Sequence, residues 1–317
     1  MLHATLGLLA LSKSANACFH AFLTVPLVIL AAAAPFNAWT PAETDLSESA
    51  LLTAPPTALD QPVTLVLATF NIQDLMVVGR HRPERMRAIG AMLTEFDPDI
   101  VGIQESFIEP DRQVLLDALA NSRLKYHHYF RSATVGSGLL TLSAYPITEA
   151  HFYRYQHDGK WYKPYHGDWW GGKGVSLARI QLPDDAGYID FYDTHAHAGY
   201  LNRAEYLGVR KAQMHEMAAF LGASATQVSP AFLVGDMNCA PGGPDFQIAL
   251  EEAQLVRLMA VGSGVDHIFG VRNPRYTFEV LDSQPIRKAV PIGPNRRVRL
   301  SDHTGYLSTI RITPTGT

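Results

Sequence analysis

An α/β fold is predicted by three features of the sequence: its apolar content, its alternation of strand-like and helix-like segments, and the polar residues that follow its predicted strands. The 317 residues are 47% hydrophobic, enough for the core of one large domain or two small ones. The clearest strand begins at Ala231 and stops at Gly235, where Asp236 and Asn238 follow one residue apart. In an extended chain these two side chains point the same way, so they form either a site or a polar turn.

The N-terminal residues 1–40 resemble a leader. Their one charge is Lys13, and an unbroken apolar stretch runs from residue 21 to residue 34. This length is typical of the core of a signal peptide and short for a membrane span of about 20 residues. We expect a cleaved signal that exports the protein, to the periplasm or out of the cell, or alternatively an uncleaved membrane anchor. Residues 41–60, rich in Ala, Thr, Pro and Ser, are expected to link it to a domain over 61–317.

Charge and cysteine content limit the partners and the means of stabilisation. The net charge is −4, or −5 once the leader with Lys13 is removed. This sign makes bulk nucleic acid an unlikely main partner, although a local basic groove would be compatible with it. The two cysteines are Cys18, in the leader, and Cys239. A mature form would therefore contain no internal disulfide and would depend on its apolar core.

The secondary structure follows from residue spacing along the chain. Alternating β-branched residues indicate the first strand, and apolar residues at helical spacing from Met86 to Phe96 indicate the first helix. Asn202 and Glu205 have the spacing of a capping box, which would begin a third helix. Strands are predicted over 63–69, 100–104, 137–143, 175–181, 189–194, 231–236, 266–269 and 304–312, and helices over 82–96, 111–120, 202–221 and 246–253.

Eight polar residues lie at the ends of these strands or in the loops beside them. A glutamate such as Glu105, taken alone, is more often a surface residue than a metal ligand. Its place directly after a buried strand makes the two roles about equally favoured. His195 and His197 alternate along an extended chain, so they face opposite sides and one of them can face a site. The full set is Asn71, Glu105, His195, Asp236, Asn238, Asp266, Asp302 and His303.

Three other segments have unusual composition. Residues 152–170 contain eight aromatic residues interrupted by charges, which fits either core or a loop facing a membrane. Residues 167–174 contain Asp168 and Lys173, with three glycines around the lysine. This composition fits a Gly-rich hairpin or a loop that meets a phosphate, and it does not match the Walker A pattern. Residues 271–299 hold seven basic residues and two acidic ones. This charge fits either a solvated face or a site for anionic phosphate or lipid headgroups.

In chain order the motifs resemble the endonuclease/exonuclease/phosphatase superfamily over about residues 63–312. The resemblance is carried by Phe70-Asn71-Ile72, Gln104-Glu105, Thr194-His195, Gly235-Asp236-Met237-Asn238 and Ser301-Asp302-His303. It implies a four-layer α/β/β/α sandwich of the DNase I-like type and hydrolysis of a phosphate ester with a divalent cation. Two positions depart from the familiar pattern: His267 replaces a Tyr, and Ser106-Phe107 follows the Glu.

The resemblance also implies a role for each matching residue. Glu105 would bind Mg²⁺, with Mn²⁺ as an alternative, assisted by Asn71. His303 would be the general base, oriented by Asp266, while Asp236 positions or activates the attacking water. Asn238 and His195 would donate hydrogen bonds to the phosphoryl oxygens. Asp302 would be either a ligand of a second metal or a residue behind the first ligands.

The Gly-rich loop resembles that of neutral sphingomyelinases, in which an Asp lies five residues before a Lys, as Asp168 and Lys173 do. We therefore expect a monomeric, Mg²⁺-dependent phosphodiesterase that cleaves sphingomyelin or a related phospholipid at a membrane surface, with Asp168 and Lys173 selecting the substrate. The alternatives are an endonuclease or phosphatase of the same superfamily, or a non-catalytic lipid-binding effector. The negative charge and the Trp cluster disfavour the nuclease.

Overall fold

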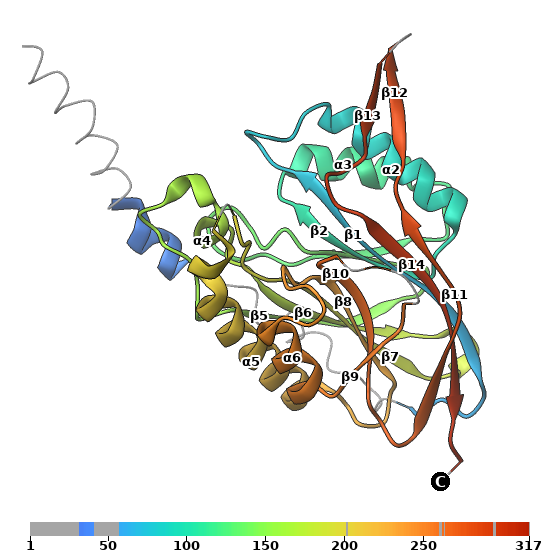
Figure 1. Cartoon of the computed structure of the whole chain (residues 1–317). Coiled ribbons are helices and arrows are strands. Elements are labelled where there is room, and N and C mark those ends of the chain that lie inside the picture. The colour runs from blue at the N-terminus through green and yellow to red at the C-terminus, as the bar shows by residue number, and fades with distance from the viewer. Residues whose placement is uncertain are drawn as a thin grey trace, which may run out of the picture.

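Two six-stranded β-sheets packed face to face form the centre of the protein (Figure 1). The computed structural model describes residues 32–40, 57–200, 202–259, 262, 264–293 and 296–316. The core between the sheets includes Leu67 from one sheet and Phe191 and Phe232 from the other, all fully buried. Burial of these side chains holds the two sheets together.

The first sheet joins the N-terminal and C-terminal parts of the domain. Its strands lie in the order β11 (Tyr276–Ile286), β14 (Gly305–Pro314), β1 (Val63–Asp74), β2 (Ile100–Ser106), β4 (Leu140–Ser143) and β3 (Tyr126–Tyr129). Strand β1 runs parallel to β2, with Asn71 paired to Gln104. Parallel strands end at the same edge of a sheet, so Asn71 and Glu105 lie near each other.

The second sheet brings three further chain segments to one edge. Its strands lie in the order β5 (Ile147–Arg154), β6 (Gly174–Gln181), β7 (Tyr188–His195), β8 (Ala231–Asp236), β10 (Asp266–Val271) and β9 (Leu255–Arg257). Parallel pairing of β7 with β8 places His195 opposite Asp236, and antiparallel pairing of β10 with β8 places Asp266 opposite the same residue.

Helices cover the outer face of each sheet (Figure 1). The first sheet packs on α2 (Arg82–Phe96) and α3 (Glu109–Ala118), through buried residues such as Met86 and Leu115. The second packs on α5 (Leu207–Ser224) and α6 (Pro244–Glu252), through Met214 and Phe246. The predicted four-layer α/β/β/α sandwich is therefore confirmed.

Residues 271–299 form three strands that the sequence did not predict. The longest is β11, and β12 (Ala289–Gly293) and β13 (Arg296–Arg299) form a hairpin that stands out from the body (Figure 1). The sequence did not indicate β11 because its proline and its polar residues obscure the apolar pattern of a strand. Such residues are tolerated in an edge strand but not in a central one. It is indeed at the edge of its sheet.

The predicted capping box at Asn202 is wrong. A 3₁₀ turn, Arg203–Tyr206, precedes α5, and the Asn202 side chain makes no capping hydrogen bond to this turn. A second short helix, α4 (Asp168–Gly171), forms within the Gly-rich loop. A Gly-rich stretch gives little helical signal, so the sequence did not predict it.

Residues 32–39 are helical and pack beside α4 (Figure 1). Asn37 is fully buried: its Nδ2 donates to the Trp169 carbonyl (3.1 Å), and its Oδ1 accepts from the Thr134 amide (2.9 Å). The rest of the predicted leader and most of the predicted linker, residues 1–31 and 41–56, lie outside the described residues. Within the described part of the chain, no helix has the length and apolar character needed to cross a membrane.

Candidate active site at the edge of the two sheets

The strand ends are brought together by a close approach of β7 and β8. Gly235 has φ 137°, and a Cβ on it would lie 2.0 Å from the Thr194 carbonyl oxygen. Only glycine fits this backbone position. The glycine thus lets Asp236 sit directly beside His195, at the end of the buried apolar run that first marked this stretch of sequence.

Asn71 holds two carboxylates together. Its Nδ2 donates to Glu105 Oε1 and to Asp236 Oδ2, each at 3.0 Å, while its Oδ1 accepts from the Gln73 amide. Asp236 is 1% exposed and Glu105 is half-buried. Glu105 has φ 58° and Asn238 has φ 51°, left-handed conformations that are costly for residues with a Cβ. Such strain is found where a side chain must be aimed at a site.

His195 lies beside the same carboxylates. Its Nε2 is 3.3 Å from Asp236 Oδ2, 3.9 Å from Glu105 Oε1 and 2.8 Å from Lys173 Nζ. Its Nδ1 is buried and has no hydrogen-bond partner among the described residues. Nε2 thus faces one acceptor, the Asp236 carboxylate, and one group that can only donate, the Lys173 ammonium.

His303 and Asp266 form a second pair across the site. His303 Nδ1 is 3.0 Å from Asp266 Oδ2, and its Nε2 points inward, 3.7 Å from Asp236 Oδ2. Burial alone would lower the pKa of His303, but the hydrogen bond to Asp266 and the charge of Asp236 raise it to about 10. The arrangement therefore stabilises a proton on the imidazole ring.

The pKa of Asp236 is held below its usual range. Burial alone would raise it, but the contact with His195 and the charge of His303 outweigh that effect. Asp236 is thus an ionised carboxylate in the resting site, with Glu105 close by. Glu105, His195 and Asp236 offer ligand atoms within 4.8 Å of one another, as do Asp236, Asp266 and His303.

The oxygen atoms of this cluster fit a hard divalent cation. Mg²⁺ prefers carboxylate and water oxygens, and Glu105 and Asp236 present two carboxylates to one point, bridged by Asn71. A cation there would offset the repulsion between the two negative charges. Asn71 faces this point with its amide nitrogen, so it orients the two carboxylates while its oxygen is bound to Gln73.

Asp168 and Lys173 lie behind His195 and are shielded from solvent. Lys173 is 3% exposed, and its Nζ is 2.8 Å from Asp168 Oδ1 and 2.9 Å from the Ala196 carbonyl. Asp168 also accepts from the Ala198 amide at 2.7 Å. Burial would raise the pKa of Asp168, but Lys173 and nearby histidines lower it overall. Substrate selection was predicted for this pair; its placement gives it a supporting position beneath His195.

Asn238 faces the same supporting carbonyl. Its Nδ2 donates to the Ala196 carbonyl at 3.0 Å, and its amide donates to Asp236 Oδ1 at 2.9 Å. The side chain is half-buried at the edge of the cluster. The Asn238 amide group has a second N–H, which leaves a donor for a further acceptor.

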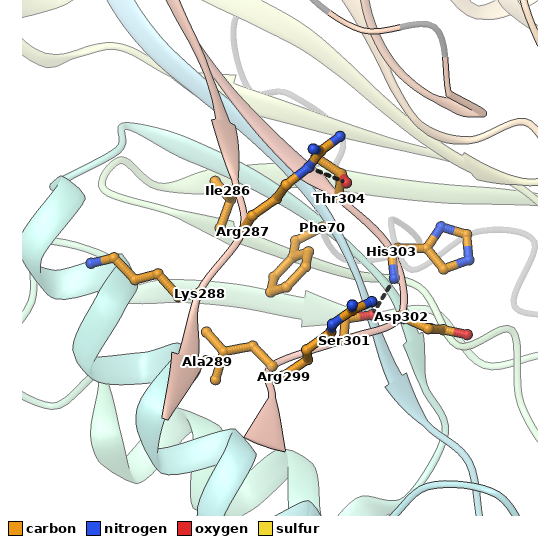
Figure 2. A pocket seen from close by; sticks show the side chains of 11 residues that line it. Phe70, Ile286, Arg287, Lys288, Ala289, Arg299, Ser301, Asp302, His303 and Thr304 are labelled. Carbon is orange, nitrogen blue, oxygen red and sulfur yellow. Dashed lines mark hydrogen bonds between the residues drawn. The ribbon is translucent and has the colours of Figure 1, made fainter. Parts of the chain in front are cut away.

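Asp302 is set apart from the carboxylate cluster. It is exposed, its Oδ1 is 3.3 Å from Ser301 Oγ, and it belongs to neither group of ligand atoms found among the described residues. Figure 2 shows it beside His303, at the edge of a cavity of about 340 Å³. This position is on the outer side of the loop that carries His303.

Arg85 is a further residue on which the site depends. It is 2% exposed and donates to the carbonyls of Ile72 (2.5 Å), Gln73 (2.8 Å) and Leu300 (2.7 Å). These carbonyls flank Asn71 on one side and the Ser301–His303 loop on the other. Our sequence reasoning missed it, although a charged residue on the apolar face of a helix, four residues before Ile89, is a usable signal.

Comparison with known proteins finds relatives that match part of this chain. Sphingomyelin phosphodiesterase 2 of Rattus norvegicus is 36% identical over 183 residues, covering 56% of this chain and 42% of the rat protein. An inositol phosphosphingolipids phospholipase C of Schizosaccharomyces pombe is 33% identical over 185 residues, covering 58% of this chain and 43% of that protein. The chain thus matches less than half the length of each relative.

A solved structure supports the fold, and a family model identifies the family. A mutant beta toxin of Staphylococcus aureus, solved with bound magnesium ions, superposes with a TM-score of 0.58 at 18% identity, covering 79% of this chain and 99% of the toxin. At this identity the likeness concerns the fold. The model of the endonuclease/exonuclease/phosphatase family matches residues 68–303, well over half of the sequence. The chain belongs to the endonuclease/exonuclease/phosphatase family.

Proposed function

We propose that the protein is a Mg²⁺-dependent phosphodiesterase that hydrolyses sphingomyelin to ceramide and phosphocholine. The observation that carries the proposal is the meeting of two carboxylates, Glu105 and Asp236, with the His303–Asp266 pair at one strand edge. This set supplies a cation site and a base within a few ångströms of each other. The names of the relatives support a phosphosphingolipid as the substrate.

His303 would take the proton of the attacking water. Its Nε2 points into the cluster, and Asp266 on Nδ1 fixes the ring and steadies the imidazolium that forms. Because two carboxylates raise its pKa, a neutral His303 requires positive charge nearby. A divalent cation held by Glu105 and Asp236 would supply that charge and polarise a phosphoryl oxygen. The water oxygen then bonds to phosphorus while the bond from phosphorus to the ceramide oxygen breaks, and the ceramide oxygen takes up a proton from solvent.

His195 and Asn238 would stabilise the charge that develops on the phosphoryl oxygens. Asn238 Nδ2 is a donor held by the Ala196 carbonyl, and His195 is held through its Nε2 by Lys173. Donors fixed in advance stabilise a transition state more than donors that must reorganise. In this account Lys173 acts through His195 and has no contact with substrate.

The lipid part of the proposal rests on the surface as well as on the relatives. Of the aromatic residues of segment 152–170, Phe152 and Tyr155 are buried, whereas Trp161, Tyr162 and Tyr165 are 39%, 54% and 76% exposed. Exposed Trp and Tyr side chains are typical of proteins that contact the lipid–water boundary. We expect a monomer that meets the membrane through this surface.

Export or membrane anchoring by the N-terminal segment is also a proposal. Sequencing the N-terminus of the protein recovered from its native compartment tests it. A start near residue 40 would support cleavage, and an intact N-terminus in the membrane fraction would support anchoring. An intact N-terminus in the soluble cytosolic fraction would contradict both.

A substrate comparison tests the activity. The full chain, with Mg²⁺, is incubated with vesicles containing sphingomyelin, with vesicles containing inositol phosphoceramide, and with supercoiled plasmid. Release of phosphocholine that stops when EDTA is added supports the proposal. Plasmid nicking would favour a nuclease of the same family, inositol phosphate release alone would change the headgroup, and vesicle binding without turnover would favour a lipid-binding effector.

A further inference from the structure

A cavity on the outer side of the His303 loop is left over once the catalytic cluster is assigned. It has a volume of about 340 Å³ and lies at the foot of the β12–β13 hairpin (Figures 1 and 2). Its wall is apolar: Figure 2 shows the Phe70 ring at the centre, with Ile286 and Ala289 beside it. A second cavity, of about 320 Å³, shares Arg287 and His303 with it and reaches Asp266.

The rim of this cavity is positively charged. Arg287 and Arg299 extend on either side of the Phe70 ring in Figure 2, and both are exposed. Arg287 Nε donates to Thr304 Oγ1, which leaves its other nitrogens available. Arg299 forms no ion pair with any described residue. Lys288 points away in Figure 2 and pairs with Glu95.

The acidic residues nearby leave the rim cationic. Asp302 contributes the single carboxylate of the lining residues, against the guanidinium groups of Arg287 and Arg299. Two guanidinium groups over an apolar wall fit a ligand with an anionic phosphate and an apolar part next to it. A lone phosphate would leave the wall unused, and an alkyl group would leave the guanidinium groups unpaired.

We propose that this cavity binds the phosphate headgroup of an anionic phospholipid that is not the substrate, through Arg287 and Arg299. The assignment rests on the proposed function in one respect, since that function places the protein at a lipid surface. Binding at this site would fix the His303 side of the catalytic cluster against the membrane. The enzyme would then bind anionic membranes in preference to neutral ones.

Strand β11 provides a matched control, because arginines lie just beyond both of its ends. Arg287 follows the strand, whereas Arg272 and Arg275 precede it, and the Arg275 carbonyl accepts from the Thr315 amide near the C-terminus. Both of these are exposed. The variants Arg287→Gln/Arg299→Gln and Arg272→Gln/Arg275→Gln therefore make the same change in net charge at opposite ends of one strand.

The test is co-sedimentation of the full chain with phosphatidylcholine vesicles, with and without phosphatidylglycerol, in EDTA and without sphingomyelin. We expect Arg287→Gln/Arg299→Gln to lower partitioning onto the anionic vesicles by about 30-fold, the effect of two cations at an anionic surface, and the Arg272/Arg275 variant to change it by less than about twofold. Soluble glycerol phosphate at millimolar concentration should compete weakly.

Two results would overturn the proposal. Equal losses in the two double variants, or none in Arg287→Gln/Arg299→Gln, would show that only general charge attraction is at work. Full competition by glycerol phosphate would show that the cavity takes small phosphate esters and that the lipid assignment is wrong. Because no turnover is measured, a protein that fails to hydrolyse sphingomyelin can still pass this test, and an active enzyme can fail it.

Discussion

The two histidines at the active-site edge contact the same carboxylate but are supported in opposite ways. The Nε2 atoms of His303 and His195 lie 3.7 and 3.3 Å from Asp236 Oδ2. Behind His303, Asp266 accepts from Nδ1, whereas the Nδ1 of His195 has no partner among the described residues. The side chain of His303 is 21% exposed and that of His195 is 2% exposed.

This difference separates a histidine arranged to accept a proton from a histidine that is held in place by its neighbours. A carboxylate on the second nitrogen lowers the cost of adding a proton to His303, and partial exposure lets that proton leave. His195 is buried, and its Nε2 lies 2.8 Å from the Lys173 ammonium, which holds the ring in place. The comparison predicts that the pair are not interchangeable, and the variants below are ordered by the size of the expected effect.

The largest effect is expected for His303→Ala. Loss of a general base lowers turnover by at least about 10²-fold. The measurement is phosphocholine release at saturating Mg²⁺, with circular dichroism to check folding. His215→Ala, which removes an exposed histidine on α5 that pairs with Glu252, is the matched control and should keep normal turnover. Activity of His303→Ala within a few-fold of normal would remove it from the mechanism.

A smaller loss, about tenfold or more, is expected for Lys173→Met, because His195 loses the group that holds its Nε2. The buried position predicts equal losses on sphingomyelin and on a small soluble phosphodiester. If activity were lost on sphingomyelin and kept on the soluble phosphodiester, Lys173 would select the substrate, as the loop motif alone predicts.

Folding has to be controlled in this experiment, since Lys173→Met leaves Asp168 charged and buried. An unpaired buried carboxylate costs about 3 kcal/mol of unfolding free energy. Asp168→Asn/Lys173→Met removes both charges and should recover most of that stability in urea unfolding, while turnover stays low. Recovery of turnover together with stability would mean that Lys173 matters only for folding.

Most of the layered fold could be predicted because periodicity records burial. The helix predicted over 82–96 is α2 with the same bounds, and each strand that precedes a motif residue is present. The edge strands β3, β5, β9 and β11 and the hairpin strands β12 and β13 were missed. Side chains of the edge strands face partly toward solvent, so they lack the apolar pattern that marks a buried strand.

The residues of the site could be predicted, but not the way they support one another. Strand ends identify Glu105, Asp236 and His303 as candidates, since parallel strands end at one edge. They do not reveal that Lys173 lies behind His195. Contacts of this kind depend on how two sheets pack, which spacing along one chain does not specify.

Arg85 tests why His303 needs an anchor and His195 does not. His195 ends a continuous strand, whereas His303 lies in a loop held by the bond from Arg85 to the Leu300 carbonyl. Arg85→Lys keeps the charge but loses the fork of donors, which we expect to cost about 2 kcal/mol of unfolding free energy and to lower turnover severalfold. Urea unfolding and turnover on the soluble diester measure the two effects. A variant with normal turnover and lower stability would limit Arg85 to folding.

His267 extends the comparison to a histidine without a carboxylate partner. It is fully buried, its Nε2 donates to the Cys239 carbonyl, and burial lowers its pKa to about 4. In the unfolded chain its pKa is about 6.5. Between these two values the unfolded chain binds a proton that the folded protein excludes, so stability falls as pH falls from about 6.5 to about 4, by up to about 1.4 kcal/mol per pH unit.

His267→Gln removes this titration and keeps a donor for the Cys239 carbonyl. Urea unfolding measured from pH 8 to pH 4 should give a shallower loss of stability for the variant, with the difference confined to the range below about pH 6.5. Ile268→Val, a change in the adjacent buried residue, should lower stability by about 1 kcal/mol at every pH and leave the slope unchanged. Parallel pH profiles for the wild type and His267→Gln would show that burial does not hold this imidazole neutral. If His303→Ala loses turnover and His267→Gln gives a shallower profile, the two results together would show that a carboxylate partner decides which of these two histidines binds a proton.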